Sequence, residues 1–165
     1  MAFASPTAAL DAIKTCLAPV SKRIHTGPTN SGAGLPCCDD SGHGEPLIRI
    51  ETYTAAPKQG QVTLRNISRN RCGDFVLTLD ITYQTCWNPF DGDGPDNKTL
   101  ADATAQGGAL VESWWSILAR LVCCEAISSE VRFESQQDLP SEGGCAGWQM
   151  RINVDVSMCD CANVG

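Results

Sequence analysis

Cysteine is the residue type in this chain with the widest chemical potential. Ten cysteines occur in 165 residues, and only two histidines accompany them. Thiols coordinate metals, form disulfides or act as nucleophiles, and the spacing between them helps to distinguish these uses. The cysteines include two vicinal pairs and one pair separated by a single residue, and they lie at Cys16, Cys37, Cys38, Cys72, Cys86, Cys123, Cys124, Cys145, Cys159 and Cys161.

This spacing does not favour a structural zinc site. Tetrahedral zinc is usually held by ligand pairs with two to four residues between them, often with histidine, and no two cysteines here have that spacing. We therefore expect no metal and no cofactor. We expect most of the thiols to be small buried side chains, some of them able to form disulfides outside a reducing compartment. The candidate structural cysteines are Cys37, Cys38, Cys72, Cys123, Cys124 and Cys145.

Catalytic motifs are missing from the sequence. It contains no Gly-x-Ser-x-Gly, no P-loop and no His-Glu-x-x-His. Both histidines, His25 and His43, fall in a predicted loop, and nothing in the sequence places a thiol beside either ring. We therefore expect that the protein is not an enzyme.

Net charge and the absence of long apolar runs argue against several classes of partner. The formal net charge of -7 argues against a surface that binds nucleic-acid backbone or anionic lipid, because both attract clustered Lys and Arg. No apolar run approaches the ~18 residues of a membrane span. The N-terminus lacks the basic and apolar blocks of an export signal. We expect a soluble single domain over residues 1–165, with no membrane partner.

Alternating side chains predict the strands. Residues 148–158 place apolar side chains at every even position and polar ones at every odd position, as in a half-buried strand. Residues 75–84 repeat this design. Two less distinct strands are predicted at 47–54 and 130–137, and the segment 25–45 is predicted to be a loop because it is rich in Gly, Pro, Ser and Thr.

Helical periodicity predicts two helices. Ser5-Pro6-Thr7 combines a capping side chain with a proline in the first turn, and apolar residues then recur at helical spacing as far as Leu17. A longer amphipathic helix is predicted from Thr99 to Cys124. We therefore predict an α+β fold, in which an N-terminal helix and a long central helix pack on one face of a four-stranded, mostly antiparallel sheet.

The central helix carries two features that point beyond a simple core. Trp114 and Trp115 lie about 100° apart on a helix, so one of them, with Trp115 as the candidate, is expected to face a partner. An alternative is that both flank one wide apolar stripe. Gly107-Gly108 costs about 1–2 kcal/mol relative to alanine in a helix interior, which suggests close backbone packing there.

A basic connection between the first two predicted strands stands out in this acidic chain. Residues 55–71 are too many for a tight turn and include Lys58, Arg65, Arg69 and Arg71. We interpret the segment as a projecting arm that contacts the acidic surface of a partner. A solvated loop is the alternative.

Several short motifs together resemble one protein family. They are Cys37-Cys38-Asp39-Asp40 before the first strand, Arg71-Cys72-Gly73 before the second, the 101–124 helix that ends on a cysteine pair, and the stretch from Pro140 to Gly147 before the last strand. In this order they resemble the tail terminator proteins of long, non-contractile-tailed actinobacteriophages (siphovirus type). The arm at 55–71 departs from the family.

The resemblance implies a structural virion protein. Such proteins form a six-fold ring that caps the tail tube and joins it to a head-side connector or stopper protein. The implied partners are further copies of the chain, assembled as a hexamer, together with the tube and connector proteins. The basic arm would contact a neighbouring subunit or the tube. DNA would pass through the lumen without specific binding, and the virion would be assembled in the host cytoplasm.

Two other functions are compatible with the sequence. One is another neck component, such as a head-completion or stopper protein. The other, from a different class, is a cysteine-rich metal-binding or redox module.

Overall fold

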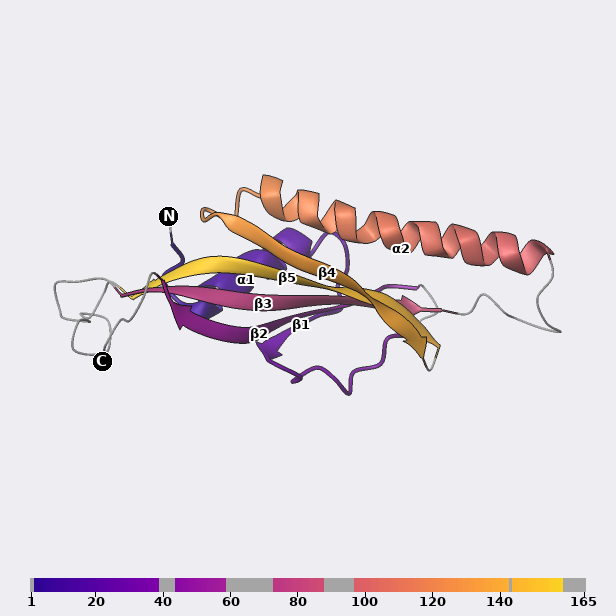
Figure 1. The fold of residues 1–165 in the computed structure, drawn as a ribbon, viewed down its shortest axis with the longest axis horizontal. Coiled ribbons are helices and arrows are strands. Elements are labelled where there is room, and N and C mark those ends of the chain that lie inside the picture. The colour runs from indigo at the N-terminus through magenta and orange to yellow at the C-terminus, as the bar shows by residue number, and fades with distance from the viewer. Residues whose placement is uncertain (1, 39–43, 59–72, 88–96, 143, 159–165) are drawn as a thin grey trace.

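Five strands form one mixed sheet in the computed structural model, which describes residues 2–38, 44–58, 73–87, 97–142 and 144–158 (Figure 1). The order of strands across the sheet is β1-β2-β3-β5-β4. Only β1 and β2 run parallel, and the other neighbours in the sheet are antiparallel. The strands are β1 Ile24–Pro28, β2 Leu47–Pro57, β3 Gly73–Cys86, β4 Val131–Glu142 and β5 Cys145–Met158.

The prediction of a four-stranded, mostly antiparallel sheet is therefore wrong, although the α+β class is consistent with the structure. The missed strand is β1, because residues 25–28 were predicted to be part of a loop. Its five residues end in Gly27-Pro28 and show no alternation of apolar and polar side chains, so no sequence pattern predicted the strand. Its backbone pairs in parallel with β2, from Ile24 opposite Ile48 to Pro28 opposite Thr52. Backbone pairing with an existing strand needs no side-chain pattern, which is why the sequence concealed it.

The two strongly alternating segments form the centre of the sheet. β3 and β5 pair over their whole length, with Leu79 opposite Ile152 near the middle. Because alternate side chains point to opposite faces, one face of both strands is apolar and the other is polar. The buried apolar side chains of this pair are Leu77, Leu79, Ile81, Ala146, Trp148, Met150, Ile152, Val154 and Val156.

Both helices contribute to the core on the apolar face. Helix α1, Pro6–Leu17, begins as predicted at Ser5, whose hydroxyl accepts a hydrogen bond from the Ala8 amide. Helix α2, Asn97–Cys123, is much longer, and a disulfide between Cys16 and Cys124 ties its C-terminal end to α1. In Figure 1, α2 crosses above the sheet and its N-terminal part extends past the sheet's end. Among the described residues, no helix is long and apolar enough to span a membrane.

Candidate interaction surface

Helix α2 has an inward side that packs on the sheet. Ile117 and Leu121 are each 1% exposed and belong to the same core as the central strands. Trp114 is partly buried against this core. Ser113, directly before Trp114, accepts a hydrogen bond of 2.8 Å from the indole Nε1 of Trp148. This short stretch therefore anchors α2 to the sheet.

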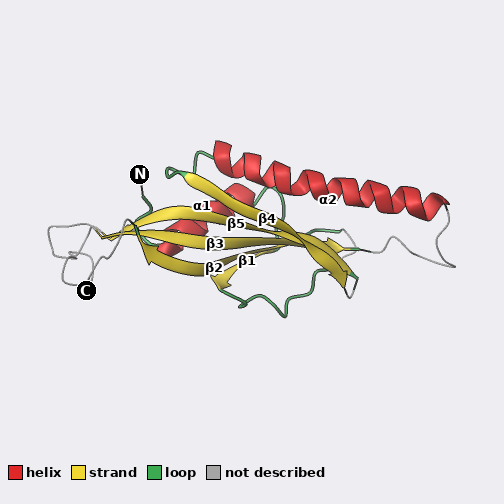
Figure 2. Ribbon diagram, viewed as in Figure 1, coloured by secondary structure: helices red, strands yellow, loops and turns green. Residues whose placement is uncertain are grey.

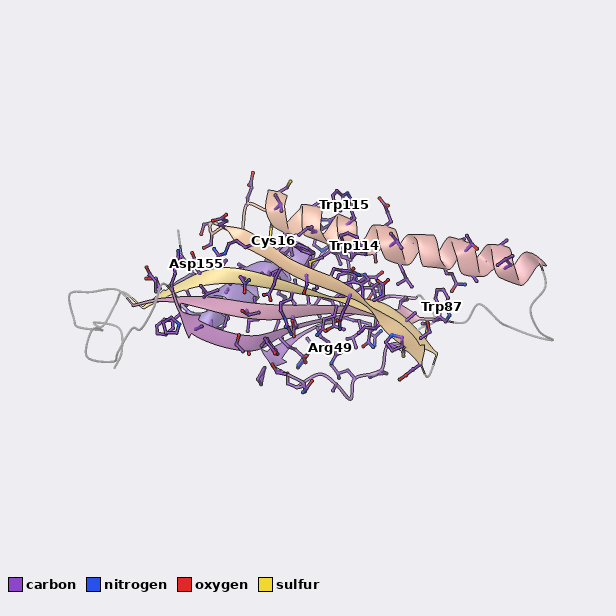
Figure 3. The ribbon with its side chains drawn as sticks, in the orientation of Figure 1. Cys16, Arg49, Trp87, Trp114, Trp115 and Asp155 are labelled. Carbon is purple, nitrogen blue, oxygen red and sulfur yellow. A yellow bond between two sulfur atoms is a disulfide. The ribbon has the colours of Figure 1, made fainter. Side chains whose placement is uncertain are left out.

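The neighbouring Trp115 points the other way. Its side chain is 59% exposed, and its ring meets that of Trp114 edge-on, with centroids 5.8 Å apart. Figure 3 shows the two rings on different sides of the helix ribbon. The geometry therefore separates the roles of the two tryptophans: Trp114 packs inside the chain, and Trp115 faces solvent.

Trp115 is one of four large apolar side chains exposed along the same side of α2. At 100° per residue, all four fall within an arc of about 60°. Contiguous exposed apolar surface commonly marks an interaction site, and Val111, Trp115 and Val122 lie within about three turns of one another. We call this set the α2 stripe; it consists of Leu100 at 65% exposure, Val111 at 57%, Trp115 at 59% and Val122 at 68%.

Gly107 and Gly108 border the α2 stripe. A Cβ atom added to either glycine would meet no atom within 4 Å outside the local helix backbone in the described part of the chain. The close packing that the sequence suggested is thus not made among the described residues. Bare backbone beside Val111 and Trp115 instead leaves room for a neighbouring surface.

A groove separates part of α2 from the sheet. Tyr83 stacks on Trp148 with ring centroids 5.3 Å apart and nearly parallel planes, and burial raises the pKa of the Tyr83 hydroxyl. The groove beside this pair has a volume of about 400 Å³. It is lined by Tyr83, Thr85, Cys86, Trp87, Gln106, Ala109 and Leu110. The N-terminal half of α2 is therefore less closely supported than the anchored stretch.

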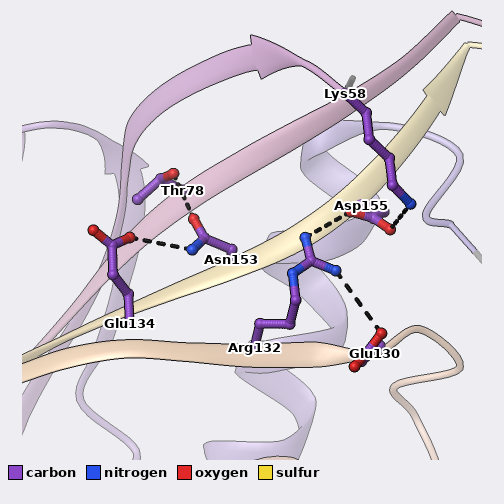
Figure 4. A network of polar contacts seen from close by, with 7 residues as sticks. All are labelled: Lys58, Thr78, Glu130, Arg132, Glu134, Asn153 and Asp155. Carbon is purple, nitrogen blue, oxygen red and sulfur yellow. Dashed lines mark hydrogen bonds and ion pairs between the residues drawn. The ribbon is translucent and has the colours of Figure 1, made fainter. Parts of the chain in front are cut away.

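The basic arm is described only at its first cation. Lys58 lies at the end of β2, where its Nζ is 2.7 Å from a carboxylate oxygen of Asp155 (Figure 4). Its side chain remains 41% exposed. Arg65, Arg69 and Arg71 lie outside the described residues, so the role of the arm in contacts with partners stays a prediction.

Asp155 is the centre of a small ionic network on the polar face. Besides Lys58, it accepts a 2.7 Å hydrogen bond from Arg132 of β4, and Glu130 lies 4.0 Å from the same guanidinium. The bond from Arg132, with a further contribution from Lys58, holds the pKa of the Asp155 carboxyl below its usual range despite partial burial. This network ties β2, β4 and β5 together.

A second cation holds the middle of the polar face. The Arg151 guanidinium makes two bonds to Asp80, of 2.8 and 3.2 Å, and lies 3.7 Å from the centre of the Tyr53 ring. These contacts satisfy the charges of both Asp80 and Arg151. On the polar face these contacts join side chains of β2, β3 and β5, as the apolar core does on the other face.

A hollow beside β1 offers a surface different from the α2 stripe. It has a volume of about 320 Å³. Leu35, which is 42% exposed, contributes an apolar side chain to its wall. The complete lining consists of Lys22, Arg23, Ile24, His25, Leu35, Pro36 and Leu47.

The cysteines fall into disulfides, apart from one exposed thiol among those described. The pairs are Cys16–Cys124, Cys37–Cys145 and Cys38–Cys86, and the exposed free thiol is Cys123. Cys72 lies outside the described residues. Cys16 and Cys86 were not among the predicted structural cysteines, because their positions carry no local motif. The described residues contain no group of three or more His, Cys, Asp or Glu side chains that could hold a metal ion.

No protein-family model matches the sequence, and no curated protein matches it. Among solved structures, the chain is similar to the sheath/tube terminator of an extracellular contractile injection system, PVC, in its extended state. The two share 14% sequence identity with a TM-score of 0.37, over 97% of this chain and 59% of that one. The chain thus spans less than two thirds of that protein's length, and a likeness this weak supports no argument about function.

Proposed function

We propose that this protein is a tail terminator: a structural subunit that forms a ring on the end of a tail tube, with six copies as the resemblance implies. The proposal starts from the sequence motifs that resemble those of siphovirus-type actinobacteriophages. The observation that carries it is the α2 stripe, because a ring subunit needs apolar surface that its own fold leaves uncovered.

The α2 stripe has the extent and composition of a subunit interface. From Leu100 to Val122 it runs about 33 Å along the helix. Trp115 lies within it, and buried aromatic side chains commonly dominate the energy of an interface. Gly107 and Gly108 allow another chain to approach the helix backbone closely. Covering this surface would remove four large apolar side chains from water, which is the main driving force for association.

A closed ring also needs a second, different patch on each subunit, because its contacts run head to tail. The hollow beside β1 is our candidate. It carries the cations Lys22 and Arg23, whereas the exposed Glu112 borders the α2 stripe, about 60° around the helix from Trp115. Opposite charges at the margins of the two patches favour this pairing over self-association of either patch.

Such a ring would stop growth of the tube by presenting a tube-like face on one side and a different face on the other. Tube subunits could then no longer add, and the second face would receive the head-side connector. In this proposal DNA passes through the lumen without specific contacts.

Assembly is tested directly by native mass measurement. The wild-type protein is expected to form a closed ring at micromolar concentration, and Trp115→Ser is expected to shift it to the monomer. Arg120→Ser is the matched control, because it also removes a large exposed side chain from α2, about 140° around the helix from Trp115. A wild-type protein that stays monomeric with purified tube protein present would contradict the ring.

The role in the particle is tested by removing the protein from its phage. We expect filled heads beside unattached tails, many of them abnormally long, and we expect purified protein to restore joining only on tubes of normal length. Tails of normal length beside heads that leak DNA would instead assign the protein to the head side of the neck, as a stopper.

A further inference from the structure

Four cysteines from three distant parts of the sequence meet at one end of the sheet. Cys37 is bonded to Cys145 with 6.0 Å between Cα atoms, and Cys38 is bonded to Cys86 with 4.9 Å. The Sγ atoms of the vicinal pair are only 3.8 Å apart. The two disulfides therefore lie side by side, close enough for a thiolate released from one to reach the other.

A third pairing is built into the sheet itself. Cys86 and Cys145 stand directly opposite each other on β3 and β5. Beside them, the Trp87 amide donates a 2.7 Å hydrogen bond to the Gly144 carbonyl, so the cysteines occupy the next, non-hydrogen-bonded position of the ladder. Opposed residues at such positions have Cα atoms about 4.5 Å apart, which is within the range that a disulfide spans.

We propose that these four cysteines form a disulfide relay that releases the vicinal pair after a single two-electron reduction. A dithiol reductant first reduces Cys38–Cys86 and is itself oxidised to a disulfide. The Cys86 thiolate then attacks Cys145 Sγ, forming Cys86–Cys145 and expelling Cys37 as a thiolate. The numbers of disulfides and dithiols are conserved. The step consumes the dithiol of the reductant and produces its disulfide, while the protein exchanges two disulfides for the single bond Cys86–Cys145 and the dithiol of Cys37 and Cys38.

The relay would act on a particular segment. The loop after β1, residues 29–38, runs toward the disulfides at the end of β3 (Figure 2). Besides the disulfides, two sets of hydrogen bonds hold this loop. The Gly32 amide donates a 2.7 Å hydrogen bond to the Glu51 carboxylate, and Arg23 donates to the Pro36 and Cys37 carbonyls. The exchange removes the covalent tie of this loop and leaves β3 and β5 cross-linked.

The released segment includes part of the hollow beside β1. Leu35 and Pro36 line that hollow and directly precede the vicinal cysteines. Reduction would thus loosen one wall of the hollow without opening the sheet. This inference does not depend on the proposed function, because it concerns only the sulfur chemistry of the isolated chain.

Trypsin separates the four cysteines in a way that reports the pairing. Cleavage after Lys and Arg places Cys37 and Cys38 in peptide 24–49, Cys86 in peptide 72–98 and Cys145 in peptide 133–151. In the oxidised protein, disulfides join all three peptides. After the relay, peptide 24–49 is released with two free thiols, while the other two peptides stay joined.

The experiment treats oxidised full-length protein with one molar equivalent of dithiothreitol without oxygen, traps free thiols with a maleimide, and maps the peptides by mass spectrometry. We expect more than half of the reduced molecules to carry the Cys86–Cys145 bond and two trapped thiols in peptide 24–49. The same result is expected for Cys16→Ser/Cys124→Ser, which removes the third disulfide. Trapped Cys38 and Cys86 with Cys37–Cys145 intact would overturn the relay.

A second variant tests the cross-strand bond alone. In Cys37→Ser/Cys38→Ser, air oxidation is expected to join Cys86 to Cys145, whereas Cys86 and Cys145 remaining as thiols would overturn the proposal. The conformational consequence is measured by hydrogen exchange: the Gly32 amide is expected to exchange at least tenfold faster in the relayed protein, with the β3 amides unchanged. Equal protection of Gly32 in both forms would contradict release of the loop.

Discussion

The two sides of helix α2 are both apolar, yet only one of them is used by the chain that contains it. The inward side places Ile117 and Leu121 in the core, at 1% exposure each. The outward side leaves Val111, Trp115 and Val122 more than half exposed. The difference teaches that hydrophobicity did not decide burial here. The sheet has one apolar face, and the helix can cover it with only one of its sides.

The two sides of α2 also differ in the role that we assign to them: one stabilises the subunit, and the other takes part in assembly. Side chains on the inward side contribute to folding, and those on the outward side become useful only when another surface covers them. The following predictions test this division, and they run from the largest expected effect on stability to the smallest.

Adjacent residues provide the sharpest comparison. Leu121→Ala is expected to lower the free energy of unfolding by about 2–5 kcal/mol, because it opens a cavity in the core. Val122→Ala is expected to change it by less than about 0.5 kcal/mol, because that side chain is 68% exposed. Urea unfolding of the two variants measures both values. Similar losses in the two would show that the outward side also supports the fold of the isolated subunit.

Removal of the disulfide at the end of α2 is expected to have the next largest effect on stability. Replacing Cys16 and Cys124 together with serine should lower the free energy of unfolding of the oxidised protein by about 2–4 kcal/mol, because the bond closes a sequence separation of 108 residues. Cys123→Ser, which removes the adjacent exposed thiol, is the control and should leave stability unchanged. Equal stability of all three proteins would argue against this bond.

Thiol counting gives an independent test of the same chemistry. Protein kept reduced from lysis and then denatured should titrate nearly all ten thiols. Oxidised protein should titrate no more than four, because three disulfides occupy the other six. We also expect elemental analysis to find no stoichiometric zinc. One zinc per chain would favour the metal-binding module instead.

The ionic network on the polar face predicts a smaller effect that depends on pH. The pKa of Asp155 is lowered in the folded state, so its carboxylate stabilises the fold above the usual aspartate pKa of about 4, and this contribution is lost as the pH falls through the lowered value. Asp155→Asn should therefore cost about 1–3 kcal/mol at pH 7 and progressively less in acid. Melting curves between pH 7 and 2.5 measure this loss of stability, with the exposed Asp102→Asn as the control. A loss that does not vary with pH would contradict the assigned role of the Asp155 carboxylate.

The basic arm is expected to have no effect on stability. Arg65→Ser/Arg69→Ser/Arg71→Ser should leave the melting temperature within about 1 °C, because the sequence predicts these residues on a projecting arm, where substitutions would change stability little. We expect the same variant to weaken ring formation or tail joining at physiological salt, because it removes three cations that we interpret as binding acidic surface. Unaltered assembly would show that the arm is a solvated loop.

Local patterns in the sequence predicted much of the fold. The alternation in β3 and β5, the Ser5 cap of α1 and the long amphipathic pattern of α2 each specify an element from neighbouring residues alone, because propensity and periodicity act over a few positions. The boundaries of these elements moved by only a few residues in the structure. The α+β class followed from their order.

The tertiary structure alone decided what depends on residues distant in the sequence. It added β1, whose Gly27-Pro28 ending resembles a loop and whose pairing comes from the backbone of β2. It selected Cys16 and Cys86 as disulfide partners, since sequence spacing carries no record of which thiols meet after folding. It also decided which tryptophan is covered, because Trp114 and Trp115 are chemically identical and only the position of the sheet distinguishes the two sides of the helix.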